Sequence, residues 1–226
     1  MGTGPAPTDA PRAPLTRERI VALALAIVDR EGLPALNMRR LADEAGVKPM
    51  SLYHHFPNKR AILDGVAESI AAAALAGRRP AGDWQGQVRT LFSQLHRLVR
   101  AHPRALPLIS TAVIGTPSGR RWMEELLRVL LEAGFSPDRA AATYHTLGAY
   151  TLGLGYADLL GLEVSPESVV RRLAGHWADY PNMLRVGMRL LAWDAPGEFE
   201  TGFDALLAPF ASQASDGAAP EEGGRS

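Results

Sequence analysis

The sequence contains no cysteine among its 226 residues. Disulfide bonds and thiolate metal sites are therefore excluded, and the composition is compatible with a reducing cytoplasm, where we expect the protein to act. The chain also has no net charge, because 24 Lys and Arg residues balance 24 Asp and Glu residues. At this length it can bury a core that is large enough for one or two domains.

The absence of net charge does not extend to every segment. From Arg12 to Arg60, nine Lys and Arg residues outnumber five Asp and Glu residues, so this segment carries a net charge of +4. A neutral protein with one basic end can still orient on a polyanion. The weak total charge predicts only modest non-specific affinity for nucleic acid at physiological salt.

One charge-free segment is long enough to be considered as a membrane span. The 18 residues from Ala140 to Ala157 carry no formal charge, but three threonines and His145 interrupt them. A helix that is buried on several sides is the better interpretation, and we expect no membrane partner. The N-terminus lacks a basic segment followed by an apolar one, so we also expect no secretion signal.

Alternation of apolar and polar residues, which is typical of strands, is not sustained in this sequence. β-Branched residues are scattered instead of clustered, so we predict an all-α fold. The loop 76–83 contains Gly77, Pro80 and Gly82 and is the expected boundary between two domains. The expected helices are 17–30, 38–45, 49–56, 59–75, 84–101, 103–113, 118–133, 137–160, 166–174, 181–191 and 198–212.

Both ends of the chain are poor in apolar bulk. Residues 1–14 and 214–226 are rich in Ala, Pro, Gly and Ser and are predicted to be a disordered arm and a disordered tail. The folded domains should then occupy residues 15–75 and 84–213.

The segment from Asn37 to Lys59 is the most informative part of the sequence. Asn37 is a suitable N-cap for a first helix, and Gly46 can adopt the left-handed backbone conformation that ends it. Pro49 suits the first turn of a second helix, where its missing N–H is harmless, and Leu52 and Phe56 share the inner face of that helix. The segment therefore predicts two short helices joined by a tight turn.

The outer face of the second helix is polar and aromatic. It carries Lys48, Met50, Ser51, Tyr53 and one of the two histidines at 54 and 55. This pattern is that of a helix-turn-helix whose second helix lies in the major groove of DNA. An ordinary two-helix hairpin with exposed Tyr and His side chains would give the same pattern and is the alternative.

The chain resembles the tetracycline-repressor (TetR) family of regulators over residues 16–75. The resemblance rests on the opening helix 15–32 and on Leu41-Ala42, Gly46-Val47, Leu52-Tyr53, Phe56 and Asn58-Lys59-Arg60. It implies an N-terminal three-helix DNA-binding domain with a helix-turn-helix, followed by a larger helical ligand-binding and dimerisation domain. The residues that it implies for DNA binding are Arg39, Lys48, Pro49, Met50, Ser51, Tyr53, His55 and Lys59.

The chemistry of these residues divides the implied contacts into two kinds. Ser51 can hydrogen-bond a base edge and Met50 can touch a thymine methyl, whereas Tyr53 and Lys59 suit phosphate oxygens. Pro49 departs from the polar residue that some family members have at this position. Because proline cannot hydrogen-bond a base, we expect an operator that differs from the tetracycline operator.

The C-terminal half resembles the effector domain of the tetracycline-repressor branch at residues 83–85, 115–117, 134–136, 150–153 and 199–203. The resemblance implies a four-helix bundle formed by two helices from each of two subunits. Small residues and an apolar stripe fit such close packing, although an intrachain core would also explain them. The predicted homodimer interface consists of Gly148, Gly153, Ala157, Phe199, Phe203, Leu206, Leu207 and Phe210.

The same branch implies a ligand pocket with an apolar lining and one or two polar tips, which suits a small hydrophobic molecule. An ordinary helical core would have the same composition. The implied lining consists of Leu75, Leu91, Leu95, Met123, Leu126, Ala141, Tyr144 and His145. The positions of the family's magnesium-tetracycline ligands fall here on Val113 and Ala157, which cannot bind a hard cation.

No metal site, cofactor or catalytic residue is predicted. The six histidines form no His-x-x-x-His pair or His/Asp/Glu cluster, and Gly153-Leu154-Gly155 lacks both a third glycine and a preceding strand. We therefore predict a homodimeric repressor that binds a palindromic operator in double-stranded DNA and is released by an unidentified small-molecule effector. A DNA-binding regulator without an effector and a helical enzyme are the alternatives.

Overall fold

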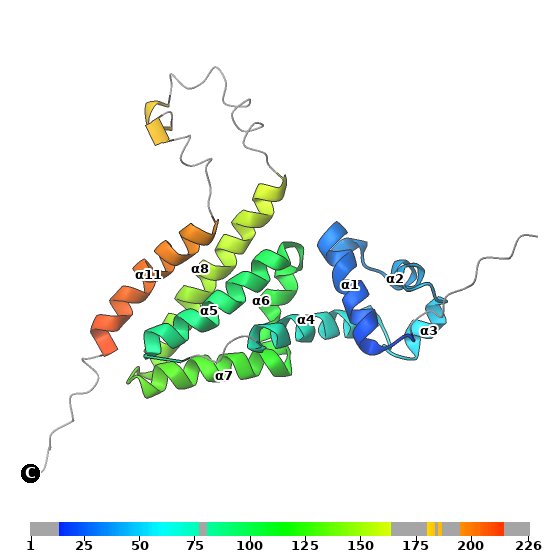
Figure 1. The fold of residues 1–226 in the computed structure, drawn as a ribbon, viewed down its shortest axis with the longest axis horizontal. Coiled ribbons are helices and arrows are strands. Elements are labelled where there is room, and N and C mark those ends of the chain that lie inside the picture. The colour runs from blue at the N-terminus through cyan, green and yellow to red at the C-terminus, as the bar shows by residue number, and fades with distance from the viewer. Residues whose placement is uncertain (1–13, 77–80, 164–179, 184, 187–194, 215–226) are drawn as a thin grey trace, which may run out of the picture. The chain divides into compact units, whose positions relative to one another are not determined.

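The computed structural model describes residues 14–76, 81–163, 180–183, 185–186 and 195–214 (Figure 1). No strand occurs within these ranges, which confirms the all-α prediction. None of the helices in the same ranges is long and apolar enough to cross a membrane. The predicted arm and tail lie outside the described residues, apart from residue 14 and residue 214.

The first of two compact units is Met1–Val66. Side chains that are almost completely inaccessible to solvent form its core, among them Ile20, Ile27, Leu41, Leu52 and Phe56. The unit consists of α1 (Arg17–Glu31), the short 3-10 helix η1 (Leu33–Ala35), α2 (Met38–Ala45), α3 (Pro49–Tyr53) and the first half of α4 (Lys59–Leu75).

Side-chain caps and one glycine set the ends of these helices. The Asn37 side chain accepts a hydrogen bond from the Arg40 N–H at 2.9 Å, and the Asn58 side chain accepts one from the Ala61 N–H at 2.9 Å. Gly46 has φ 68° and ψ 34°, the left-handed conformation that a residue with a Cβ rarely adopts. The predicted start and end of α2 are therefore confirmed.

Helix α3 is shorter than predicted, since it ends at Tyr53 instead of Phe56. Beyond Tyr53 the chain turns, and the N–H groups of His55 and Phe56 both donate to the Leu52 carbonyl at 2.9 Å. Pro57 explains the early end, because proline disfavours helical geometry in the residue before it. Phe56 nevertheless remains buried, so the predicted inner face is confirmed.

The second compact unit, Ala67–Ser226, contains the rest of the fold. Helix α5 packs against both α7 and α8, α6 packs against α7, and α11 lies along α8 (Figure 1). The core between them includes Phe92, Trp122, Leu126, Phe199 and Phe203. Its elements are the second half of α4, α5 (Trp84–Ala101), η2 (Pro103–Ala105), α6 (Leu106–Gly115), α7 (Pro117–Glu132), α8 (Pro137–Glu163) and α11 (Ala195–Ala214).

Most helices of the second unit begin and end within a few residues of their predicted bounds. The exception is the predicted helix 103–113, which begins as the 3-10 helix η2 and becomes regular only from Leu106. Pro103 and Pro107 lack an N–H, so neither can donate a backbone hydrogen bond in these turns. The predicted helix 166–174 and most of 181–191 lie outside the described residues.

The apolar stripe of α11 is buried inside its own chain. Phe199, Phe203 and Leu207 belong to the core of the second unit, and Leu206 and Phe210 are partly buried against it. An intrachain core, which the sequence also allowed, therefore explains the burial of this stripe. Pairing of the stripe with a second chain stays a prediction. Around Gly148 and Gly153 of α8, by contrast, there is open space.

The two units divide after Val66, within α4, and not in the loop 76–83. α4 is one continuous helix from Lys59 to Leu75 and contributes buried side chains to both units, among them Ile62 in the first and Ile70 in the second. The exact limits of the functional domains stay a prediction.

Gly155 marks a close approach of α8 to α5. A Cβ at Gly155 would lie 1.8 Å from Cγ1 of the buried Val99 and 3.3 Å from its Cβ. We expect Gly155→Ala to lower the free energy of unfolding by about 1–3 kcal/mol in urea denaturation, because the side chains must shift. Gly115→Ala is the control, since no atom lies within 4 Å of its Cβ position and alanine favours helix. Equal stability of the two variants would contradict the close approach.

Candidate nucleic-acid interface and effector cavity

Helix α3 presents one of its faces to solvent. Leu52 is fully buried, whereas Met50 is 68% exposed and Tyr53 is 45% exposed. Both exposed side chains lie on the face that the sequence assigned to DNA. Of the other residues implied for DNA binding, Arg39, Lys48 and Pro49 are exposed, and Ser51, His55 and Lys59 are partly exposed.

The positive charges of the first unit fall into two groups. Arg30 pairs with Glu44 at 3.1 Å, Arg40 pairs with Glu31 at 2.6 Å, and Arg60 pairs with Asp64 at 3.0 Å. Within the described residues, no ion pair or side-chain hydrogen bond engages Arg39, Lys48 or Lys59. These three cations belong to the set that the sequence assigned to DNA, and they can meet phosphates without breaking an existing pair.

Arg17 supports the end of α3 and was not predicted from the sequence. Its guanidinium lies 4.0 Å from the centre of the Phe56 ring and donates a hydrogen bond to the His55 carbonyl. The residue thereby satisfies a carbonyl that the short helix leaves without an intrahelical partner. Nothing in the local sequence around Arg17 indicates this role, because its partners lie about forty residues away.

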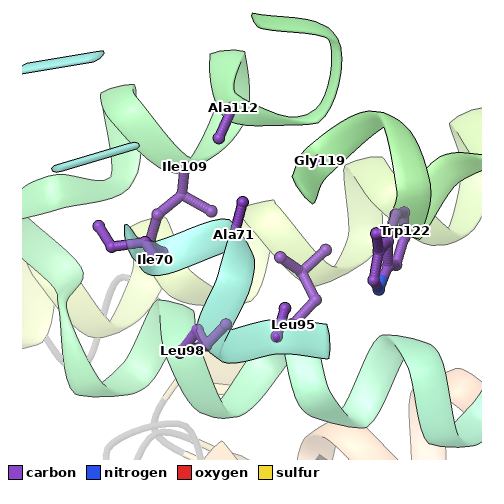
Figure 2. A pocket seen from close by; sticks show the side chains of 9 residues that line it. Ile70, Ala71, Leu95, Leu98, Ile109, Ala112, Gly119 and Trp122 are labelled. Carbon is purple, nitrogen blue, oxygen red and sulfur yellow. The ribbon is translucent and has the colours of Figure 1, made fainter. Parts of the chain in front are cut away.

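The second unit contains a partly open apolar cavity of about 20 Å³, enough for about one water molecule. Four helices supply its walls, and Figure 2 shows Ala112 of α6 facing Ala71 of α4 across it. Side chains of Ile, Leu, Ala and Trp make up the lining, together with one glycine. The lining residues are Ile70, Ala71, Ala74, Leu95, Leu98, Ile109, Ala112, Gly119 and Trp122.

Among the residues that were predicted to contact ligand, only Leu95 lines this cavity. Leu91 and Leu126 are buried in the main core, and Leu75, Met123 and Tyr144 are partly buried against it. Ala141 and His145 are exposed. Burial raises the pKa of Tyr144, so its hydroxyl stays protonated at neutral pH. Ligand contacts by these seven residues stay a prediction.

Next to the cavity, Glu68 of α4 caps the N-terminus of α7. Its carboxylate accepts hydrogen bonds from the Ser118 backbone N–H at 3.1 Å and from the Ser118 hydroxyl at 2.6 Å. Partial burial opposes ionisation of Glu68, but the hydrogen bonds from Ser118 and Thr116 outweigh it and lower its pKa below the ordinary value. The ionised carboxylate thus holds α4 against α7, at Gly119 of the cavity wall.

A second hollow, of about 480 Å³, lies between α5 and α11. It is lined by Ser93, His96, Arg97, Arg100, Phe199 and Glu200. The His96 ring stacks on Phe199 with 4.1 Å between ring centres, and burial lowers its pKa, so the imidazole is neutral at pH 7.

Metal binding and catalysis each require particular side-chain groups. No group of three His, Cys, Asp or Glu side chains that could hold a metal ion occurs in the described part of the chain. The lining of the apolar cavity contains no acid, base or nucleophile. Ala157, one of the two positions aligned with the family's metal ligands, is partly buried in α8.

Two family models together match most of the chain. The model described as bacterial regulatory proteins of the tetR family matches residues 20–66, and the tetracyclin repressor-like C-terminal domain matches residues 76–212. The HTH-type transcriptional repressor DrrR1 of Streptomyces coeruleorubidus is 30% identical over 161 residues, which are 70% of this chain and 58% of that repressor.

Solved structures of two regulators have the same fold. ActR of Streptomyces coelicolor in complex with actinorhodin superposes with a TM-score of 0.71 at 27% identity, over 91% of this chain and 100% of that chain. BioQ with its double-stranded DNA operator superposes with a TM-score of 0.57 at 27% identity, over 79% of this chain and 96% of that chain. The chain therefore belongs to the TetR family of bacterial regulatory proteins and is a DNA-binding transcriptional regulator.

Proposed function

We propose that the protein is a homodimeric repressor that leaves a palindromic operator when a small hydrophobic molecule enters the cavity beside α4. The observation that carries this proposal is that the two halves of α4 contribute to two different sites. Ile62 belongs to the core of the unit that carries α3, whereas Ile70, Ala71 and Ala74 line the cavity. A shift of α4 at the cavity therefore changes the position of residues that support the recognition helix.

The cavity as described is too small for an effector. Its volume of about 20 Å³ is far below the roughly 300–1,000 Å³ of a site for a drug-sized ligand. The ligand must therefore bind a different conformer, in which α4 has moved away from α6 and α7. Because the ligand binds that conformer better, it shifts the population toward it and away from the operator-binding one. Support comes from ActR, which was solved in complex with actinorhodin.

The exposed residues of α3 support direct operator binding, as does the BioQ complex with its operator. We propose that Tyr53, Lys48 and Lys59 contact phosphates, while Arg39, Pro49, Met50, Ser51 and His55 face the base edges. The operator would be bound in the cytoplasm, where the bacterial chromosome lies.

Operator contacts can be separated by their dependence on salt and sequence. The double variant Tyr53→Ala/Lys59→Ala should weaken operator binding on all sequences and flatten the salt dependence, because phosphate contacts are lost. Ser51→Ala should instead change which bases are preferred, with a loss of about 1–3 kcal/mol at the affected position. Fluorescence anisotropy with operators selected from random DNA measures both effects. Unchanged affinity and salt dependence in the double variant would contradict the assignment.

The Glu68 link should bias the equilibrium toward operator binding. We expect Glu68→Gln to weaken operator binding and to strengthen effector binding, since the two Ser118 donors engage two different carboxylate oxygens and an amide has only one. Glu124→Gln, which removes the same charge from an exposed position on α7, is the control.

The Glu68 effect should also depend on pH. A carboxylate whose pKa is lowered in the folded state stabilises that state above its unfolded pKa, and the contribution is lost as the pH falls through the folded pKa. The difference between wild type and Glu68→Gln should thus shrink below about pH 4. Operator and effector affinities of Glu68→Gln that match those of wild type at pH 7 would refute the link.

A stripe of exposed residues on α8 supports the homodimer. Ala149, Gly153, Tyr156 and Leu160 follow the spacing of four, three and four residues that places them on one face of a helix, and all four are exposed. Small residues in such a stripe allow two helices to approach closely. A second copy of the same stripe, related by two-fold symmetry, would also place a second α3 on the palindrome.

Two leucines of equal exposure test this interface. Leu160 in the stripe is 47% exposed, and Leu131 at the end of α7 is 48% exposed. We expect Leu160→Arg to shift the protein toward the monomer in light scattering, because a charge would be buried at the interface, whereas Leu131→Arg should remain dimeric. A monomeric wild type, or a dimeric Leu160→Arg at the lowest measurable concentrations, would contradict the proposed interface.

A regulator without an effector is the second candidate, and the small volume of the cavity favours it. Such a protein would show no ligand that raises its melting temperature. An enzymatic role has weaker support, because the cavity lining offers no group for acid–base or nucleophilic catalysis.

A further inference from the structure

One residue in the lining of the apolar cavity carries a polar side-chain group. In the described lining, Trp122 is the only residue whose side chain carries a nitrogen or oxygen atom, its indole Nε1–H. Trp122 is 3% exposed, and Figure 2 shows its nitrogen at the end of the ring that lies away from the α7 backbone. The other side chains that line this cavity in the described residues are apolar.

The indole N–H is also unsatisfied. Within the described chain, Trp122 Nε1 is buried and has no hydrogen-bond partner. The ring packs edge to face against Phe92 at 5.4 Å between ring centres, and Phe92 offers no lone pair. Indole N–H groups are donors only, and buried tryptophans usually find an acceptor. A buried donor without an acceptor is destabilising, so a ligand that supplies one gains more than the same ligand gains in water.

The composition of the cavity excludes other classes of ligand. A cation would find no carboxylate or carbonyl side chain in the lining. A carboxylate or phosphate would lose its hydration and receive one neutral donor in return, which is far too little. Ala71, Ala74 and Ala112 have small side chains and Gly119 has none, so little side-chain volume has to move when a ligand enters.

We infer that the effector is a neutral, mostly hydrocarbon molecule with a ketone, quinone or similar acceptor that receives the hydrogen bond of Trp122 Nε1–H. This inference rests on the proposed function in so far as it concerns the same cavity. It adds the chemical class of the effector and names Trp122 as the residue that selects this class. Leu95, Leu98 and Ile109 contribute affinity without discriminating between members of that class.

The test uses two probes of nearly equal size and shape, 9-fluorenone, which carries one carbonyl, and fluorene, which carries none. The measured quantity is the ratio of their dissociation constants, determined by equilibrium dialysis with the full-length protein. Comparing this ratio between wild type and variant cancels the different hydrophobicity of the probes. We expect Trp122→Phe to weaken fluorenone relative to fluorene by about 3- to 10-fold, the loss of one neutral hydrogen bond.

Trp84→Phe is the matched control. Trp84 lies in the same unit, partly buried, and packs against Phe135 at 5.0 Å between ring centres without lining the cavity. Its replacement should leave the ratio of dissociation constants unchanged. An unchanged ratio in Trp122→Phe, an equal change in both variants, or the failure of both probes to bind would overturn the inference.

Wild-type protein provides a second measurement in case Trp122→Phe does not fold. With ¹⁵N-labelled tryptophan, fluorenone should move the Trp122 indole N–H resonance downfield, whereas fluorene should not. The resonance is assigned by replacing each of the other three tryptophans in turn. Equal responses to both probes would overturn the inference.

Operator release separates this inference from the proposed function. Fluorenone that binds with the expected dependence on Trp122 but leaves the operator complex intact would support the ligand class and contradict ligand-driven release. Release of the operator by both probes with equal affinities would support the regulator and overturn the role of Trp122.

Discussion

The proposed release of the operator depends on α4, which is one continuous helix with buried side chains in two cores. Its first half contributes Ile62 to the core of the first unit, and its second half forms one wall of an apolar cavity in the second unit. The proposal relies on this continuity of the backbone and of its helical hydrogen bonds, and it needs no chain of side-chain contacts.

Two polar groups near the cavity differ in whether they have a hydrogen-bond partner. Glu68 is engaged by two donors of Ser118, and this link favours the closed arrangement. The Trp122 N–H is unsatisfied in the same arrangement of the described residues. In the proposed equilibrium, the Glu68 link opposes opening of the cavity, whereas a ligand acceptor for the Trp122 N–H favours it.

The local parts of the fold could be predicted from the sequence because single residues determine them. Asn37, Gly46 and Pro49 set the bounds of α2 and the start of α3 through caps and backbone conformation, and these predictions are confirmed. The end of α3 at Tyr53 differs from the predicted end at Phe56, because Pro57 disfavours helical geometry in the residue before it. Family resemblance supplied the DNA-binding residues, whose exposure fits that role but does not test it.

The cavity could not be predicted in the same way, because its walls come from four separate helices. Ala71 and Ala112 meet across it, but an alanine on a helix face is equally compatible with core or surface. The role of Arg17 likewise depends on a contact with residues about forty positions away. Such features follow from how helices pack, which the helical periodicity of a sequence leaves undetermined.

The contact between Gly155 and Val99 has a consequence for the direction of any structural response. Backbones that approach this closely cannot slide past each other without steric overlap, so the α5–α8 pair is the stiff side of the second unit. Alanine side chains, by contrast, make the contact between α4 and α6 at Ala67, Ala71 and Ala112, and each of them covers only a small area. The second unit is therefore mechanically uneven, with its least compliant contact at the α5–α8 crossing.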